Sequence, residues 1–424
     1  MDMNMELEQP SISDSWPWSG LEDMSFDSVQ WSLPETGTPL KVIILLLSFY
    51  ILYYLSCVVN KPKLVGGEKG LQQYLIKHCP VLTERYWPKI WAFQCHFMTI
   101  LRAAFQKCPN SVVKYNREIL PLDDGGEVAL DWACQQGSVN LLNSSETTPV
   151  LLILPGITGK SQDNYLMHLS QDGILTGYRP VVFNQRGNGG LFLKGKTMRT
   201  YSASDISDLS EVVHRIQCLY PEAPIVGLGV SLGGMILTQY LHKLGNKCNL
   251  NAAIAISMVW DPFKTRESLE NRIENRNIYV RFMSTNLRSM VRRNVERLSS
   301  EEKENLPFCY ETVMTTKTIT EFDEHVTAPM FGFSSVDEYY KESRNSDKIH
   351  KICRPYICIT SADDPFVPKE SIPETGFIAN PNTLLVMTSH GGHFGFLEGL
   401  SPTINSTWMN RICRQLLTAL KNYD

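Results

Sequence analysis

Residues 227–235 read GLGVSLGGM and place Ser231 among four glycines, between the apolar run APIVGLGV and the helix-like pattern LGGMILTQYLHKL. Each glycine costs backbone stability that alanine would supply, so the run needs a structural reason. The pattern predicts a sharp turn from a strand into a helix, because side chains at Gly229 and Gly233 would collide with the turn that carries Ser231. Such a turn directs the hydroxyl away from the sheet, beside helix N–H groups that stabilise negative charge.

The regions on both sides of this turn alternate short apolar runs with helical patterns. The runs are rich in Val, Ile and Leu, which is typical of strands buried on both faces of a parallel sheet: PVLLILPG, RPVVFNQRG, APIVGLGVS, NAAIAISMVW, RPYICITSADD and NTLLVMTSHGGH. Candidate helices occupy residues 202–220, 232–244 and 406–422. Upstream, a Asp123-Asp124-Gly125-Gly126 turn predicts a hairpin. We therefore expect an α/β domain over residues 111–424, with a mostly parallel sheet and flanking helices.

One long insertion interrupts this alternation. Residues 264–353 are dense in Arg, Glu and Asn, follow a helical pattern and lack an evident parallel strand. We expect a helical cap over the carboxyl edge of the sheet, where such folds place their sites. A peripheral helical decoration is the alternative.

The amino-terminal part of the chain divides into three segments. Residues 1–40 carry eight acidic side chains and no Lys or Arg, which predicts a disordered acidic tail. Within residues 41–60, an uncharged run of 18 residues from Val42 to Val59 nearly spans a bilayer core of about 30 Å, which predicts one transmembrane anchor. A buried core helix or a cleaved signal peptide is the alternative. Residues 61–110 contain Trp87, Trp91 and Phe97 among basic residues and are expected to lie close to the membrane.

Two features of the sequence point to opposite sides of the membrane for the main domain. The flank after the anchor carries Lys61, Lys63 and further lysines, which by the positive-inside rule favours the cytoplasm. Two glycosylation sequons, at Asn143 and Asn405, would suit the lumen of an endomembrane compartment.

Composition excludes several classes of protein. The net charge of −4 offers no general basic surface for nucleic acid. Eleven cysteines, an odd number without a CxxC pair, argue against a zinc site and a disulfide scaffold. The chain has neither a complete phosphate-binding P-loop nor a GxGxxG motif. We expect no metal ion, no cofactor and no nucleic-acid partner.

A serine on a turn of this kind becomes a nucleophile when a base and an acid serve it. The run YICIT ends in Ser361-Ala362-Asp363-Asp364, and the run LLVMT ends in Ser389-His390-Gly391-Gly392-His393. Serine, then aspartate, then histidine is the chain order of one hydrolase architecture, and each candidate follows a strand. His393, after two glycines that permit a sharp loop, is the predicted base, while His390 is expected to be a loop residue.

Only one residue of the aspartate pair can be the acid, because neighbouring side chains of an extended segment diverge and Asp363 and Asp364 cannot both face the base. We favour Asp364, and Asp261 is a third candidate. Attack on an ester also needs two donors for the oxyanion. The Leu232 N–H, directly after the nucleophile, is the first, and the Ile157 N–H of the loop 155–159, PGITG, is the second, with Thr158 as its alternative.

Taken together, these motifs resemble the α/β hydrolase fold family and, within it, the membrane-anchored AB-hydrolase-domain subfamily (AB hydrolase 4 family), which includes phospholipases of eukaryotic membranes. The resemblance covers residues 40–424 and rests on five motifs in one order: LPGITG, VVFNQRGNGG, GVSLGGM, SADDPFVP and SHGGHFGFLEG. The subfamily's charge-relay set falls on Ser231, one of Asp363 and Asp364, and His393.

The resemblance implies a serine hydrolase that cleaves acyl esters of glycerophospholipids, with phosphatidylcholine a candidate, through an acyl-enzyme. It also implies a single-pass type II protein, which conflicts with the lysine distribution. Arg288, Arg292 and Arg293 of the cap are candidates for headgroup contacts or for a solvated helix face. Acyl transfer is an alternative activity, although the family's HxxxxD motif has Glu398 here. A non-catalytic protein that binds a lipid or a partner is a further alternative.

Overall fold

A computed structural model describes residues 37–67, 70–105, 113–135, 145–194, 198–399 and 407–423 of the chain. Most of the predicted acidic tail and both sequons, Asn143 and Asn405, lie outside these residues. The chain divides into two compact units, residues 1–52 and residues 53–424.

The first unit contains most of helix α1 (Gly37–Tyr53), which begins earlier than the predicted anchor and continues into the π-helical turn η1 (Tyr54–Val58). Residues 39–58 form a run of 20 residues that is long and apolar enough to cross a membrane. At 1.5 Å per residue this run matches the thickness of a bilayer core, about 30 Å.

A nine-stranded sheet forms the second unit, in the order β1-β9-β8-β7-β6-β4-β5-β3-β2. The strands from β4 to β9 pair in parallel, whereas β1, β2 and β3 pair antiparallel with their neighbours. The bounds are β1 Lys63–Val65, β2 Val113–Pro121, β3 Glu127–Gln135, β4 Val150–Leu154, β5 Arg179–Asn184, β6 Ile225–Val230, β7 Ala252–Ile256, β8 Tyr356–Ser361 and β9 Thr383–Thr388. The predicted fold class and the β2–β3 hairpin are confirmed. Strand β1 was not predicted, because three residues are too few to show an alternating pattern.

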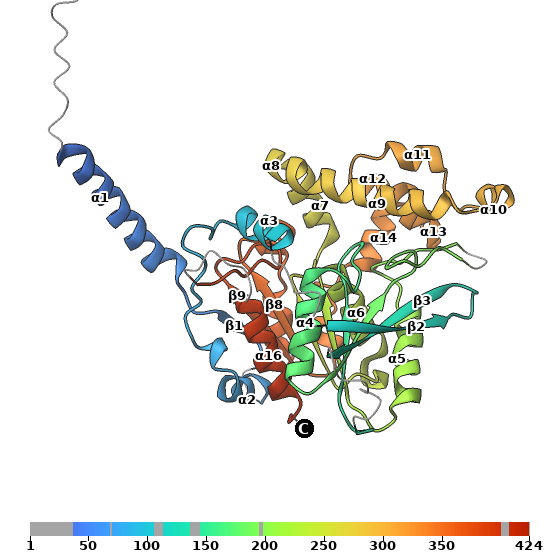
Figure 1. The fold of residues 1–424 in the computed structure, drawn as a ribbon, viewed down its shortest axis with the longest axis horizontal. Coiled ribbons are helices and arrows are strands. Elements are labelled where there is room, and N and C mark those ends of the chain that lie inside the picture. Colours follow the sequence, from blue (N-terminus) through green and yellow to red (C-terminus); the bar gives the residue numbers. More distant parts are fainter. Residues whose placement is uncertain are drawn as a thin grey trace, which may run out of the picture. The chain divides into compact units, whose positions relative to one another are not determined.

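Helices cover both faces of the sheet, so the parallel strands are buried on both sides (Figure 1). Leu152 and Leu154 of β4 join the cluster with α5 (Ser207–Leu219) and α6 (Leu232–Leu244). Leu151 and Ile153 of the same strand join the cluster with α2 (Leu71–His78), α4 (Asn164–Leu175) and α16 (Trp408–Leu420). This arrangement accounts for the continuous apolar runs in the sequence.

Between β7 and β8 the described chain is helical and has its own apolar cluster, which includes Leu287, Val291 and Phe322. Figure 1 shows these helices together above the sheet. Their bounds are α7 Pro262–Asn271, α8 Ile273–Asn275, η5 Arg276–Val280, α9 Arg281–Val295, α10 Ser300–Glu304, α11 Tyr310–Thr315, α12 Ile319–Phe322, η6 Asp323–Thr327, α13 Ala328–Met330 and α14 Val336–Ser343. Two further α-helices lie outside the cap, α3 (Cys95–Phe105) and α15 (Glu374–Ala379).

Candidate active site

Ser231 occupies a strained turn between β6 and α6. Its backbone has φ 53° and ψ −116°, a conformation that L residues rarely adopt and that the surrounding structure must hold in place. A Cβ atom on Gly229 would overlap the Gly233 carbonyl, and one on Gly233 would overlap the Leu154 carbonyl. The two glycines therefore have the steric role that the GxSxG pattern predicts. Gly234 allows close packing of α6 on β7, since its Cβ would lie 2.9 Å from the Cβ of Met258.

Three side chains that follow different strands form one hydrogen-bonded chain at this turn. His393 Nε2 lies 3.0 Å from Ser231 Oγ, and His393 Nδ1 lies 3.0 and 3.1 Å from the two carboxylate oxygens of Asp364. The Asp364 side chain is fully buried and also accepts the Phe366 N–H. With Nδ1–H donating to Asp364, Nε2 is free to take the proton of Ser231, which is the geometry of a nucleophile, a base and an orienting acid.

The loop that carries His393 is held from both sides. The Phe366 ring stacks on the imidazole, with ring centroids 4.1 Å apart. The His393 N–H donates to Thr99 Oγ1 of α3 at 2.9 Å, so a helix from the predicted membrane-proximal segment supports the site. The sequence contained no signal for this contact, because Thr99 and His393 are far apart along the chain.

The other predicted candidates lie elsewhere. Asp363 accepts the Gly392 N–H at 2.9 Å and so fixes the loop that carries His393. Asp261 caps α7 by accepting the Phe263 N–H, and His390 packs its ring edge-on against Phe93. The structure therefore brings Asp364, and not Asp363 or Asp261, to the imidazole of His393.

Burial raises the pKa of Asp363 from its ordinary value near 3.8 to about 6, against the hydrogen bond from Gly392. The folded protein consequently holds this proton more tightly than the unfolded chain. The contribution of Asp363 to the free energy of unfolding is fully present below pH 3.8 and is lost as pH rises through about 6. We expect wild type to lose about 2 kcal/mol of stability relative to Asp363→Asn over this range. Denaturant unfolding of both proteins across this range measures the difference, and a difference that does not change with pH would contradict it.

The loop Pro155–Gly159 presents one free amide next to Ser231. Tyr165 Oη accepts the Gly156 N–H and Tyr201 Oη accepts the Thr158 N–H, each at 3.0 Å, while the Gly159 N–H bonds within the loop. Among the residues the structure describes, the Ile157 N–H and the Leu232 N–H have no acceptor. Both residues line the same pocket as Ser231. These are the two predicted oxyanion donors, and the alternative donor, Thr158, is already engaged.

A buried polar network holds this loop in place. Asp131 of β3 receives two hydrogen bonds from Arg117, one from Asn184 and one from Ser161. The Ser161 N–H in turn donates to Asn184. Because Ser161 directly follows the loop, the network fixes the loop to the sheet. Neither this network nor the two tyrosines could be identified from the sequence, since no motif marks them.

Loss of the Tyr201 hydroxyl tests whether the loop needs this support. In Tyr201→Phe the Thr158 N–H, on a residue with φ 55°, loses its acceptor, so we expect the Ile157 N–H to become misaligned and kcat to fall about tenfold with little change in KM. Tyr178→Phe is the control, because it also removes a tyrosine hydroxyl that makes one hydrogen bond, here to the Leu417 carbonyl of α16. Equal kcat values for the two variants would show that the hydroxyl does not position the loop.

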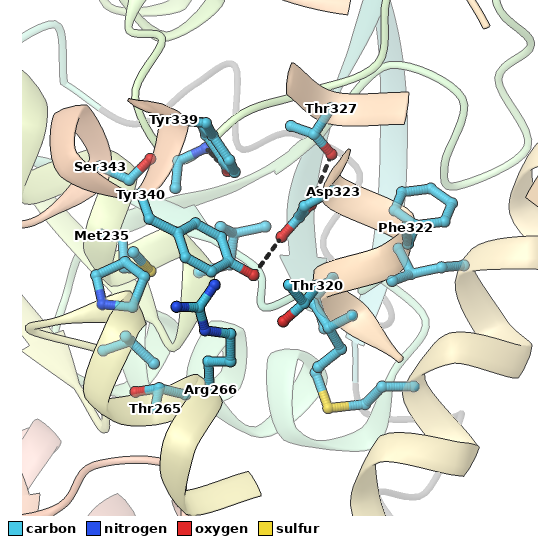
Figure 2. Close-up of a pocket in the computed structure, with 18 of the residues that line it drawn as sticks. Met235, Thr265, Arg266, Thr320, Phe322, Asp323, Thr327, Tyr339, Tyr340 and Ser343 are labelled. Carbon is cyan, nitrogen blue, oxygen red and sulfur yellow. Dashed lines mark hydrogen bonds between the residues drawn. The ribbon is translucent and has the colours of Figure 1, made fainter. Parts of the chain in front are cut away.

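Ser231 opens into a pocket of about 130 Å³ between the sheet edge and the cap. Much of its wall is apolar and comes from Met235, Leu269, Met283, Leu287 and Met290. Figure 2 shows a polar group in the same wall, where Tyr340 and Thr327 donate to the two oxygens of Asp323. Burial raises the pKa of Asp323 to about 6. The pocket has the character of a site for a chain-like apolar group, with polar side chains in part of its wall.

The arginines proposed for headgroup contact do not line this pocket. Arg288 donates to the Thr316 carbonyl and to Thr285 Oγ1 within the cap, while Arg292 and Arg293 are exposed. Glu398, which replaces the aspartate of the HxxxxD motif, is paired with Arg411 at 3.0 Å.

Comparison with known proteins identifies the family. The family model described as alpha/beta hydrolase fold matches residues 149–400. Phospholipase ABHD3 of Homo sapiens is 38% identical over 385 residues, which cover 91% of this chain and 91% of that protein. Protein abhd-3.2 of Caenorhabditis elegans is 33% identical over an alignment that covers 85% of this chain and 93% of that protein. Monoacylglycerol lipase ABHD2 of Danio rerio is 27% identical over an alignment that covers 87% of this chain and 88% of that protein. The chain belongs to the α/β hydrolase family.

Proposed function

We propose that this protein is a membrane-anchored serine hydrolase that cleaves the acyl esters of glycerophospholipids. The observation that carries the proposal is the hydrogen-bonded chain from Ser231 through His393 to Asp364 at the wall of an apolar pocket. The relatives add support, since one is named a phospholipase and another a monoacylglycerol lipase. Both names describe the cleavage of lipid esters.

The acylation step follows from the hydrogen bonds. Ser231 Oγ attacks the ester carbonyl while its proton passes to His393 Nε2, 3.0 Å away. The Ile157 and Leu232 N–H groups stabilise the oxyanion of the tetrahedral intermediate. When the intermediate collapses, His393 gives the proton to the departing alcohol oxygen, which leaves as a lysophospholipid, and the acyl group stays on Ser231.

Deacylation uses the same groups with water in place of serine. His393 takes a proton from water, the hydroxide attacks the acyl-enzyme, and the free fatty acid leaves as Ser231 recovers its proton. Asp364 holds the imidazole in the required tautomer and stabilises its positive charge in both steps. During these steps the apolar wall of the pocket holds the acyl chain.

Residues 39–58 are the proposed single membrane anchor of the protein, in an endomembrane. An anchor raises the rate of reaction on lipids because it keeps the site beside its insoluble substrate. Glycosidase treatment of protein from eukaryotic cells determines the side, since only a lumenal domain would carry glycans at Asn143 or Asn405.

A lipid profiling experiment tests the proposed activity. Purified full-length protein is incubated with a mixture of glycerophospholipids that differ in headgroup and acyl length, and mass spectrometry measures the lysophospholipids and fatty acids released. We expect release by wild type and none above background by Ser231→Ala. Added lysolipid and alcohol acceptors distinguish hydrolysis from acyl transfer. Equal release by both proteins would contradict the proposal.

A further inference from the structure

The last turn of the apolar run belongs to the second unit and makes contacts within it. The π-helical turn η1 lies within that unit, and Tyr54 Oη donates to the Pro88 carbonyl at 2.5 Å. The Tyr54 ring also lies beside the rings of Trp87 and Phe93, at 6.4 and 6.1 Å. With residues 39–58 as the proposed anchor, we expect the residues packed against its last turn to lie where the bilayer core meets the headgroups.

Large apolar side chains are exposed at this place. Trp87 and Trp91 are 45% and 47% exposed, and Phe97 and Ile100 of the adjoining α3 project from the surface as well. Single exposed apolar residues need no explanation, but a group of them marks an interaction surface. Tryptophan in particular favours the membrane interface, which makes a bilayer the fitting occupant here.

The cap reaches the same surface. His96 of α3 lies 2.8 Å from Tyr279 Oη of η5, so the two elements are in direct contact. Figure 1 shows α3 below α8 and beside α7. Two of the most exposed apolar side chains in the described part of the chain, Ile273 and Phe282, lie on the cap on either side of Tyr279 in sequence. The apolar surface therefore extends from α3 to the cap.

The charges around this part of the cap suit lipid headgroups. Arg272, Arg276 and Arg281 are exposed in the same stretch as Ile273 and Phe282, with Glu274 as the acidic residue between them. Exposed arginines beside apolar side chains combine attraction to phosphate with insertion into the bilayer.

This surface is also close to the catalytic groups. Met283, which follows Phe282, lines the pocket. The Tyr279 ring lies 5.0 Å from the ring of Phe366, which stacks on His393. The exposed Phe282 is therefore next in sequence to a residue of the pocket wall, and Tyr279 is one ring away from the ring that stacks on the catalytic histidine.

We propose that these exposed side chains form a second contact with the phospholipid bilayer, through which the lipid enters the pocket: Trp87, Trp91, Phe97, Ile100, Ile273 and Phe282. The proposal rests on the proposed function for its substrate. The bilayer contact itself is independent of hydrolysis and can be measured without it.

Photo-crosslinking measures the contact directly. The full-length Ser231→Ala protein is placed in phosphatidylcholine–phosphatidylserine nanodiscs with p-benzoyl-phenylalanine at position 97 or 282, and lipid adducts are quantified by mass spectrometry. The matched controls are positions 175 and 119, because Leu175 and Ile119 are also exposed but lie on α4 and the edge strand β2. We expect about tenfold more lipid adduct at 97 and 282. Equal yields at all four positions, or crosslinks to a second copy of the chain, would overturn the proposal.

An activity comparison then tests lipid entry. Phe97→Glu/Phe282→Glu should lower kcat/KM on bilayer phospholipid about tenfold and leave a water-soluble p-nitrophenyl ester unchanged, because only the bilayer substrate needs the surface. Leu175→Glu/Ile119→Glu should change neither rate. Unchanged bilayer activity, or an equal loss on both substrates, would contradict entry by this route. Failure of the proposed function would instead appear as wild-type inactivity on phospholipid with the crosslinks intact.

Discussion

Ser231→Ala is expected to lower kcat on lipid esters by about a million-fold, the loss seen when a serine nucleophile that works as a unit with its base is removed. The substitution takes away the atom that lies 3.0 Å from His393 Nε2 and leaves the oxyanion donors and the pocket in place. Substrate binding should therefore persist while turnover stops. Release of lysophospholipid, with binding followed separately in the same nanodiscs, measures the two effects.

A second serine provides the control for this variant. Ser343 lines the same pocket but lies on the cap helix α14, away from the histidine. Ser343→Ala should keep kcat within about twofold, as is usual for a substitution that removes no catalytic group. Substantial turnover by Ser231→Ala in the same preparation would mean that another residue is the nucleophile.

Asp364→Asn is expected to lower kcat about ten-thousand-fold, because an amide favours the wrong imidazole tautomer and provides no charge to stabilise the imidazolium. Asp363→Asn should keep kcat within about tenfold, since its amide oxygen can still accept the Gly392 N–H. Both variants replace an aspartate with asparagine, at adjacent positions, so each is the control for the other. Steady-state kinetics with circular dichroism of both variants gives the comparison.

The reverse order of activities would mean that Asp363 is the orienting acid and that the loop rearranges when substrate binds. Equal and small losses of kcat in both variants would mean that neither residue is the orienting acid. Asp261, the third candidate, would then be tested.

The parallel strands and the turn at Ser231 could be predicted because their signals are local. Continuous apolar runs predict buried strands, and the glycines at 229 and 233 predict a crowded turn. The order of Ser231, the aspartate pair and His393 predicts a common site because each residue follows a strand of one sheet. The side-chain directions at Asp363 and Asp364 depend on the loop around Gly392, so the sequence favoured one residue without deciding between them.

Other features depend on contacts between distant parts of the chain and could not be predicted. Strand β1 forms because Lys63–Val65 pairs with the edge of β9. Tyr201, which lies in a different loop, accepts the Thr158 N–H of the oxyanion loop. Arg288, a candidate for a headgroup contact or for a solvated helix face, donates to the Thr316 carbonyl. Residues 61–110, expected only to lie close to the membrane, supply Thr99 to the histidine loop.

Mapping the adduct of a fluorophosphonate probe by peptide mass spectrometry tests directly whether Ser231 is the nucleophile. The probe phosphonylates a serine that a histidine activates, so it reports the nucleophile without any choice of lipid. We expect a single adduct on Ser231 that is absent from Ser231→Ala and forms much more slowly in Asp364→Asn. An adduct on a different serine, or labelling that persists in Ser231→Ala, would contradict it.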